Sequence, residues 1–200
     1  MKAYFDSLYA RGSDPWDYRR RWYEARKRAL MLACLPRQRY RAGFEPGCAN
    51  GELAAALAAR CDSYLAADFH PVALAAARER LAGQPHVRVA EARMPDEWPA
   101  AAADGGRFDL VVLSEFGYYL DGDALAAMAW RCRETLEAGG TVIGCHWRRP
   151  IDGCVLDGDG VHRILARALA LPVLACHRED DFRLDVWSSQ PAVAQEEGLA

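Results

Sequence analysis

From residue 42 onward, short apolar runs alternate with alanine-rich stretches of helical character, and this alternation limits the possible folds more than any other feature. Such a pattern is typical of parallel strands joined by crossover helices. We therefore predict an α/β domain built from βαβ units. The strands are expected at 42–45, 63–68, 87–90, 108–114 and 141–146, and the helices between them at 50–61, 71–81 and 121–136.

The end of the domain shows a different pattern. A loop rich in Gly and Asp at 148–160 precedes a helix predicted at 161–169, and two apolar runs follow at 173–177 and 182–187. Because four polar residues separate these runs, we expect an antiparallel hairpin that closes the sheet. The chain then divides into an N-terminal helical extension, a main domain and a frayed tail, at 1–41, 42–188 and 189–200.

The N-terminal extension carries a helix-start signal. Asp14 is a suitable N-cap and Pro15 a suitable first helical residue, which predicts a helix running to about Leu35. Apolar residues recur at spacings of three and four, as expected for a buried stripe. The members of this stripe are Tyr18, Trp22, Ala25, Ala29 and Leu32.

Charge is divided unevenly along the chain. Residues 11–41 carry a net charge of +7, residues 42–200 carry −10, and the whole chain carries −3. The acidic balance argues against a nucleic-acid surface over most of the protein. The basic stretch is interpreted as a solvated helix face. The alternative is that one or two arginines, with Trp16 or Tyr23, close over an anionic ligand.

Composition excludes several other classes of protein. With 200 residues and 52% hydrophobic positions, the chain is long enough for one domain with its own core. No apolar run approaches the ~18 residues of a membrane span, and the first residues lack a signal-peptide core, so we expect a cytoplasmic protein without a membrane partner. The seven cysteines and five histidines lack metal-site spacing, so we predict neither a disulfide framework nor a metal site.

The strongest local motif lies between the first predicted strand and its helix, and reads Glu-Pro-Gly-Cys-Ala-Asn-Gly over residues 45–51. Gly47 lets the chain turn and a ligand approach the backbone, and Gly51 allows close helix-to-strand packing. A dinucleotide fold uses GxGxxG to hold a pyrophosphate, whereas this loop has GxxxG with Glu45 just before it. Since a carboxylate repels a pyrophosphate, Glu45 favours a cationic ligand, such as the ammonium and sulfonium of S-adenosylmethionine (SAM).

Asp68 ends the second predicted strand, 21 residues after Gly47. An acidic side chain at this point accepts hydrogen bonds from ribose hydroxyls in nucleoside-binding α/β domains. The alternative role for Asp68 is to complement the dipole of the following helix. The order and spacing of the two features together favour a nucleoside-binding domain.

These motifs resemble those of class I SAM-dependent methyltransferases. The resemblance rests on the loop at 45–51, Asp68, and the segments Phe108–Glu115 and Glu137–Ile143. Other motifs are similar to the nodulation protein S (NodS) family, N-methyltransferases that act on chitooligosaccharides. Those motifs are Asp14–Trp16, Trp22–Glu24, Ser114–Leu120 and Cys145–Arg148.

The resemblance implies a Rossmann-like fold with a seven-stranded, mostly parallel sheet. It also implies SAM as cofactor, S-adenosylhomocysteine (SAH) as product, and an N-terminal helix that covers the cofactor. The cofactor-binding residues implied are Trp16, Tyr23, Glu45, Gly47, Asn50, Gly51, Asp68, Phe69, Arg93, Met94 and Ser114. Arg93 departs from the family pattern because many members have an acidic residue there, which accepts a hydrogen bond from adenine, and a guanidinium cannot accept one.

An acceptor site is expected at the carboxyl ends of the strands, where open α/β sheets bind ligands. Glu115 and His146 are the candidates to orient or deprotonate the acceptor, and Tyr118 is a candidate to shape its pocket. We predict methyl transfer to a small-molecule or oligosaccharide-like acceptor, preferably at an amino nitrogen, by a monomer or homodimer. The alternatives are an O-methyltransferase, a SAM-binding module without catalysis and, more weakly, a dehydrogenase.

Overall fold

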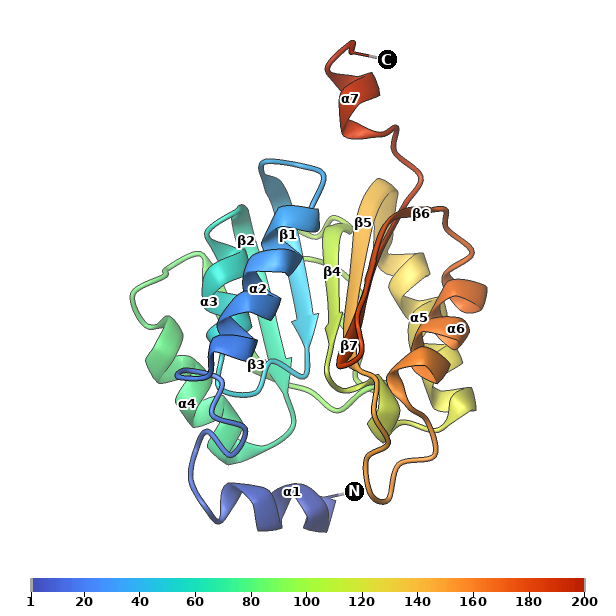
Figure 1. Ribbon diagram of the computed structural model, residues 1–200. Helices are drawn as coiled ribbons and strands as arrows, with labels where there is room; N and C mark the ends of the chain where they lie inside the picture. Colours follow the sequence, from blue (N-terminus) through green and yellow to red (C-terminus); the bar gives the residue numbers. More distant parts are fainter. Residues whose placement is uncertain (1, 200) are drawn as a thin grey trace.

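The computed structural model describes residues 2–199 and contains a seven-stranded sheet with the order β3-β2-β1-β4-β5-β7-β6 (Figure 1). The first five strands run parallel, whereas β7 pairs antiparallel with both β5 and β6. The predicted α/β fold and its closing hairpin are confirmed. The strands are β1 (Tyr40–Pro46), β2 (Cys61–Asp68), β3 (Val87–Glu91), β4 (Phe108–Ser114), β5 (Leu136–Trp147), β6 (Val173–Arg178) and β7 (Phe182–Ser188).

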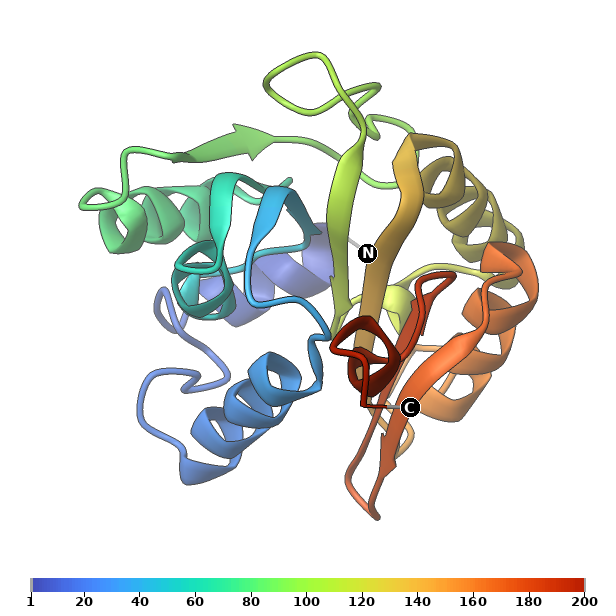
Figure 2. The same ribbon diagram turned by 90° about the horizontal axis from the view of Figure 1, so that it is seen from above.

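Helices cover both faces of this sheet (Figures 1 and 2). One face packs against α2 (Trp22–Cys34), α3 (Glu52–Ala58) and α4 (Pro71–Leu81). The other packs against α5 (Gly122–Thr135) and α6 (Gly158–Leu169). Because both faces are buried, the central strands are apolar almost throughout rather than alternating. The remaining helices are α1 (Lys2–Tyr9), the 3₁₀ turn η1 (Gly117–Tyr119) and α7 (Val193–Glu196) in the predicted tail.

The strand order determines where a ligand can bind. The chain builds β1, β2 and β3 outward in one direction, then returns to place β4 on the other side of β1. This reversal is a topological switch point, and the loops that leave β1 and β4 diverge there to opposite faces of the sheet. The carboxyl ends of these two strands are therefore the expected ligand site.

The predicted start of the N-terminal helix is wrong. Asp14 does act as a cap, but of a turn: its carboxylate accepts hydrogen bonds from the backbone N–H groups of Tyr18 and Arg19. The chain then passes through a left-handed conformation at Asp17, with φ of 58°, and α2 begins only at Trp22. A separate helix, α1, precedes this turn and was not predicted.

The predicted apolar stripe on this helix is also wrong in part. Trp22 is 77% exposed and Ala29 is exposed, whereas Glu24, Lys27 and Met31 face the protein. Apolar spacing identified a helix but not its buried face, because two charged residues of that face neutralise each other in the interior. Burial of charges is tolerated when they are paired.

The basic segment pairs with the acidic domain. Arg19 binds Glu52 at the start of α3, and Arg26 binds both carboxylate oxygens of Glu179 at 2.8 Å. Arg41 lies within hydrogen-bond distance of Asp104 and Glu137. Opposite charges thus hold part of the extension against the sheet domain, in place of the fully solvated helix face that we predicted.

No helix within residues 2–199 has the length and apolar character needed to cross a membrane.

The orientation of α2 leads to a stability prediction. Met31→Ala removes a side chain that is 1% exposed and leaves a cavity, so we expect a loss of about 2–5 kcal/mol in the free energy of unfolding. Trp22→Ala removes a larger but exposed side chain, and its effect should stay within about 0.5 kcal/mol. Urea denaturation followed by circular dichroism measures both, and a larger loss for Trp22→Ala would contradict this orientation.

Candidate functional site

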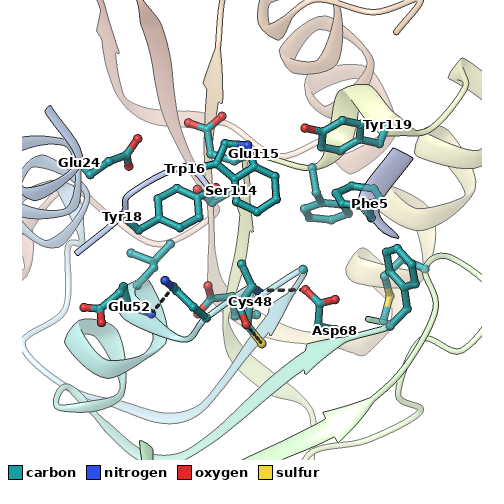
Figure 3. Close-up of a pocket in the computed structure, with 18 of the residues that line it drawn as sticks. Phe5, Trp16, Tyr18, Glu24, Cys48, Glu52, Asp68, Ser114, Glu115 and Tyr119 are labelled. Carbon is teal, nitrogen blue, oxygen red and sulfur yellow. Dashed lines mark hydrogen bonds between the residues drawn. The ribbon is translucent and has the colours of Figure 1, made fainter. Parts of the chain in front are cut away.

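A cavity lies at the carboxyl ends of β1, β2 and β4, beneath the N-terminal segment (Figure 3). We call it the first cavity. The sheet contributes the loop after β1, the end of β2, the segment after β3 and the turn after β4. The N-terminal segment contributes Phe5, Tyr9, Trp16, Tyr18, Glu24, Lys27, Arg28 and Met31.

Two glycines shape the loop after β1. Gly47 has φ of 71°, and a Cβ there would lie 3.2 Å from the ring of Phe116. Gly51 has φ of 77°, and a Cβ there would lie 3.2 Å from Cα of Ala77 on α4. Both positions combine a left-handed backbone with a close neighbour, which favours glycine. Gly51 thus allows close packing between α3 and α4, and not between a helix and a strand as predicted.

Glu45 presents a buried carboxyl group to the first cavity. It is 3% exposed, and its Oε2 accepts a hydrogen bond of 2.8 Å from the hydroxyl of Tyr64. Burial raises the pKa of Glu45 to about 8, with a further contribution from Asp68. A ligand cation beside Glu45 would offset this penalty and favour the ionised form.

Asp68 ties the end of β2 to the loop after β1. Its carboxylate accepts hydrogen bonds from the backbone N–H groups of Ala49, at 3.0 Å, and His70, at 2.9 Å. Burial raises the pKa of Asp68, although these two donors act in the opposite direction. Asp68 lines the first cavity and retains lone pairs for a ligand hydroxyl.

Asn50 carries an unsatisfied donor in the first cavity. The residue is 2% exposed, and its Oδ1 accepts a hydrogen bond from the backbone of Glu52. Its Nδ2 is buried without a partner among the described residues. Buried amide groups are nearly always hydrogen-bonded, so this donor indicates a ligand acceptor group at this position.

Phe69, Arg93 and Met94 line the far end of the first cavity. The guanidinium of Arg93 lies 5.0 Å from the ring centroid of Phe69, and Phe5 meets the same ring edge-on at 5.3 Å. A nucleobase that stacks on Phe69 would therefore share the ring of Phe69 with the guanidinium of Arg93. Ser114, at the end of β4, lines the same cavity.

A second cavity adjoins the first and shares with it Trp16, Tyr18, Glu24, Lys27, Glu115 and Tyr119. Its own walls include Tyr23, Tyr118 and Trp147. The structure therefore places Tyr23 at the second cavity and not at the first, where the resemblance had implied it. Two adjoining cavities with a common wall are the arrangement needed to bring two ligands into contact.

A buried ion cluster forms part of this common wall. The Nζ of Lys27 lies 2.9 Å from Oε2 of Glu24 and 2.7 Å from Oε1 of Glu115. Burial would lower the pKa of Lys27, but the neighbouring carboxylates outweigh it and raise the pKa above its usual value. Burial raises the pKa of Glu24, against the opposing effect of Lys27. The cluster connects α2 to the turn after β4.

Glu115 has a strained backbone, and three donors hold its carboxylate in place. Its backbone has φ of 58°, a left-handed conformation that is uncommon for residues other than glycine. Besides Lys27, its carboxylate accepts hydrogen bonds from the hydroxyl of Tyr118 and from the backbone N–H of Trp147. Strain of this kind is typical of functional sites, and Glu115 lines both cavities.

His146 lies outside the linings of both cavities and is completely buried. Its Nε2 accepts a hydrogen bond from the backbone of Gly117, and its Nδ1 lies 3.1 Å from Nε2 of His162. The Nδ1 of His162 in turn lies 2.7 Å from Asp185. Burial lowers the pKa of His146 well below its usual value. The expected role for His146 as a base that contacts the acceptor is therefore not retained, because its Nε2 binds the turn that carries Glu115 and its Nδ1 contacts His162.

Several residues at the site were not predicted from the sequence. Phe5 and Tyr9 belong to the unpredicted α1, Tyr18 was assigned to the buried apolar stripe, and Glu24 and Lys27 were given no role in the site. The spacing of Glu24 and Lys27 is that of a helical ion pair, which usually lies in solvent. No local signal distinguishes this buried pair from an exposed one.

Comparison with known proteins identifies the family. The sequence-family model of the methyltransferase domain matches residues 44–142. A protein from Pseudomonas syringae that is classified as a methyltransferase is 50% identical, with a TM-score of 0.73, over 84% of this chain and 99% of that one. This chain belongs to the SAM-dependent methyltransferase family. A search of curated protein sequences gives no match.

Other methyltransferases share the fold at lower identity. The N-methyltransferase NodS from Bradyrhizobium japonicum, solved in complex with SAH, is 23% identical with a TM-score of 0.80 over 94% of this chain and 98% of that one. An O-methyltransferase family protein from Burkholderia thailandensis is 14% identical with a TM-score of 0.74, over 94% of this chain and 62% of that one. Since one neighbour methylates nitrogen and the other belongs to an O-methyltransferase family, the fold does not distinguish the acceptor atom.

Within residues 2–199, no group of three or more His, Cys, Asp or Glu side chains is arranged to hold a metal ion.

Glu45 generates a pH prediction. Its pKa of about 8 in the folded protein exceeds the ordinary value of 4.5, so folding favours the protonated form. The resulting stabilisation is fully present below the unfolded pKa and is lost as the pH rises through about 8. Between these values, we expect the free energy of unfolding to fall more steeply for wild type than for Glu45→Gln, by at most about 1.4 kcal/mol per pH unit. Urea titrations across this range test the difference, and parallel curves would contradict it.

Proposed function

We propose that this methyltransferase transfers the methyl group of SAM to an amino nitrogen of a small-molecule or oligosaccharide-like acceptor, with the donor in the first cavity and the acceptor in the second. The observation that carries the proposal is the common wall of the two cavities, where the Glu115 carboxylate reaches both. Methyl transfer requires an in-line approach of acceptor, methyl carbon and sulfur. Alignment of two ligands across such a wall contributes up to ~7–11 kcal/mol of barrier lowering in favourable cases.

The residues of the first cavity fit SAM. Glu45 suits the ammonium of the methionine portion, and the orphaned Nδ2 of Asn50 suits its carboxylate. Asp68 would accept hydrogen bonds from the ribose hydroxyls, while Phe69 and Met94 offer apolar surface to the base. Bound SAM would supply a methyl group made electrophilic by the positive sulfonium.

The second cavity fits an acceptor with apolar surface and a polar reacting group. Tyr23, Tyr118 and Trp147 provide aromatic walls, and the hydroxyl of Tyr23 is buried without a partner among the described residues. Glu115 would orient the acceptor and receive its proton, because an amine must be neutral before it attacks. The motifs that resemble the NodS family, such as Ser114–Leu120 and Cys145–Arg148, support nitrogen as the acceptor atom.

Acceptor screening with labelled SAM tests this function. Matched pairs, such as glucosamine with glucose and deacetylated with N-acetylated chitooligosaccharides, separate transfer to nitrogen from transfer to oxygen. We expect label only in the free amines. Label in the hydroxyl compounds would establish O-methylation instead. Tight SAM binding with no transfer to any amine, sugar or phenol would favour a binding module without catalysis.

Glu115→Gln tests the assigned role of the carboxylate. The variant keeps the shape of the side chain but removes its basicity, so we expect kcat to fall about 100-fold or more. SAH affinity, measured by calorimetry, should change little. Glu134→Gln on the exposed surface of α5 is the matched control and should match wild type in both assays. Unchanged kcat in Glu115→Gln would exclude Glu115 as the required base.

A second binding prediction concerns Asp68. Asp68→Ala removes the acceptor for the ribose hydroxyls and the hydrogen bonds from the backbone N–H groups of Ala49 and His70, so we expect SAM affinity to fall about tenfold or more. Calorimetry with SAM measures the loss, with Asp62→Ala on the exposed start of β2 as control. Unchanged affinity for SAM would exclude Asp68 from the proposed donor site. A heat of binding with NAD but none with SAM would overturn the proposed function.

A further inference from the structure

We propose that Glu24 is a charge sensor for the donor, whose carboxylate favours the positive sulfonium of SAM over the neutral thioether of SAH. This inference rests on the proposed function, since it requires SAM in the first cavity. It assigns a role to a buried charged residue that methyl transfer itself does not use.

The position of Glu24 is unusual for a carboxylate. The residue is 8% exposed, and Lys27 binds its Oε2 at 2.9 Å. No side chain or backbone group within residues 2–199 donates a hydrogen bond to its Oε1, and Glu24 lines both cavities. A largely buried carboxylate with one free oxygen is costly unless a cation or donor completes it.

The ion cluster around Glu24 contains more carboxylates than ammonium groups. One ammonium, that of Lys27, is shared between the carboxylates of Glu24 and Glu115. Glu115 is further satisfied by Tyr118 and Trp147, so the unsatisfied oxygen belongs to Glu24. Arg28, the next cation on α2, donates a hydrogen bond to the backbone carbonyl of Tyr18, and its charge also acts to lower the pKa of Glu24.

The wall shared by the two cavities is also where the sulfur must lie. A methyl group can pass to an acceptor in the second cavity only from a sulfur next to the common wall, to which Glu24 belongs. Figure 3 shows Glu24 and Glu115 near Trp16 and Tyr18 at this part of the first cavity. A charge interaction at such a partly desolvated position is stronger than in water. Because SAH lacks the positive charge, Glu24 would favour release of the product.

Equilibrium binding without an acceptor tests the inference. Calorimetry would measure dissociation constants for SAM, SAH and sinefungin, a SAM analogue with a protonated amine in place of the methylated sulfur. We expect the wild type to bind SAM and sinefungin about tenfold more tightly than SAH. Glu24→Gln should bring the three dissociation constants close together. It should weaken the binding of SAM and sinefungin and leave the affinity for SAH nearly unchanged. Glu24→Asp keeps the charge and should keep much of the preference.

Glu134→Gln, remote from the cavities, is the control and should keep the full preference. If Glu24→Gln weakens the binding of SAM and of SAH equally, Glu24 contacts a group that both ligands share, and the inference is overturned. An unchanged ratio would overturn it as well. If Glu24→Gln does not fold, the wild type still decides, because equal affinity for SAM and SAH is incompatible with a charge sensor. Failure of the wild type to bind any of the three ligands would instead overturn the proposed function.

Discussion

The ammonium of Lys27 lies in the interior between the carboxylates of Glu24 and Glu115, and the geometry of the site depends on this contact. The ion cluster joins α2 to the turn after β4, which are far apart in the sequence. Each charge would be costly alone at this depth, and removal of one partner would leave another uncompensated. The cluster therefore fixes the N-terminal segment over the sheet. Its three side chains also line both cavities at the place where the cavities adjoin.

The sheet and the hydrogen bonds beneath it supply the rest of the arrangement. The reversal of strand order between β1 and β4 opens the ligand site, and Asp68 holds the loop after β1 in place. Behind the Glu115 turn, Gly117 donates to His146, which lies against His162. With Nε2 of His146 accepting, its proton resides on Nδ1 and is donated to His162. This buried pair of imidazole rings thus supports the strained turn.

Charge complementarity connects the extension to the domain. The sequence divides into a basic N-terminal stretch and an acidic remainder, and the structure pairs them through contacts such as Arg19 with Glu52 and Arg26 with Glu179. Exposed pairs of this kind contribute little stability individually. Their number along one segment still favours a single orientation of the extension, in which its aromatic residues cover the first cavity.

From residue 42 to residue 188, the sequence by itself determined the order of strands and α-helices, the α/β class, and the loop and Asp68 at the first cavity, because these depend on local patterns of apolar residues and glycine. It also identified Glu115 at the end of β4. Only the tertiary structure decided that Trp22 faces solvent while Glu24 and Lys27 face inward, and that His146 supports the turn rather than the acceptor. The physical reason is that a charged or titratable side chain takes its role from partners far away in the chain, and no local spacing specifies those partners.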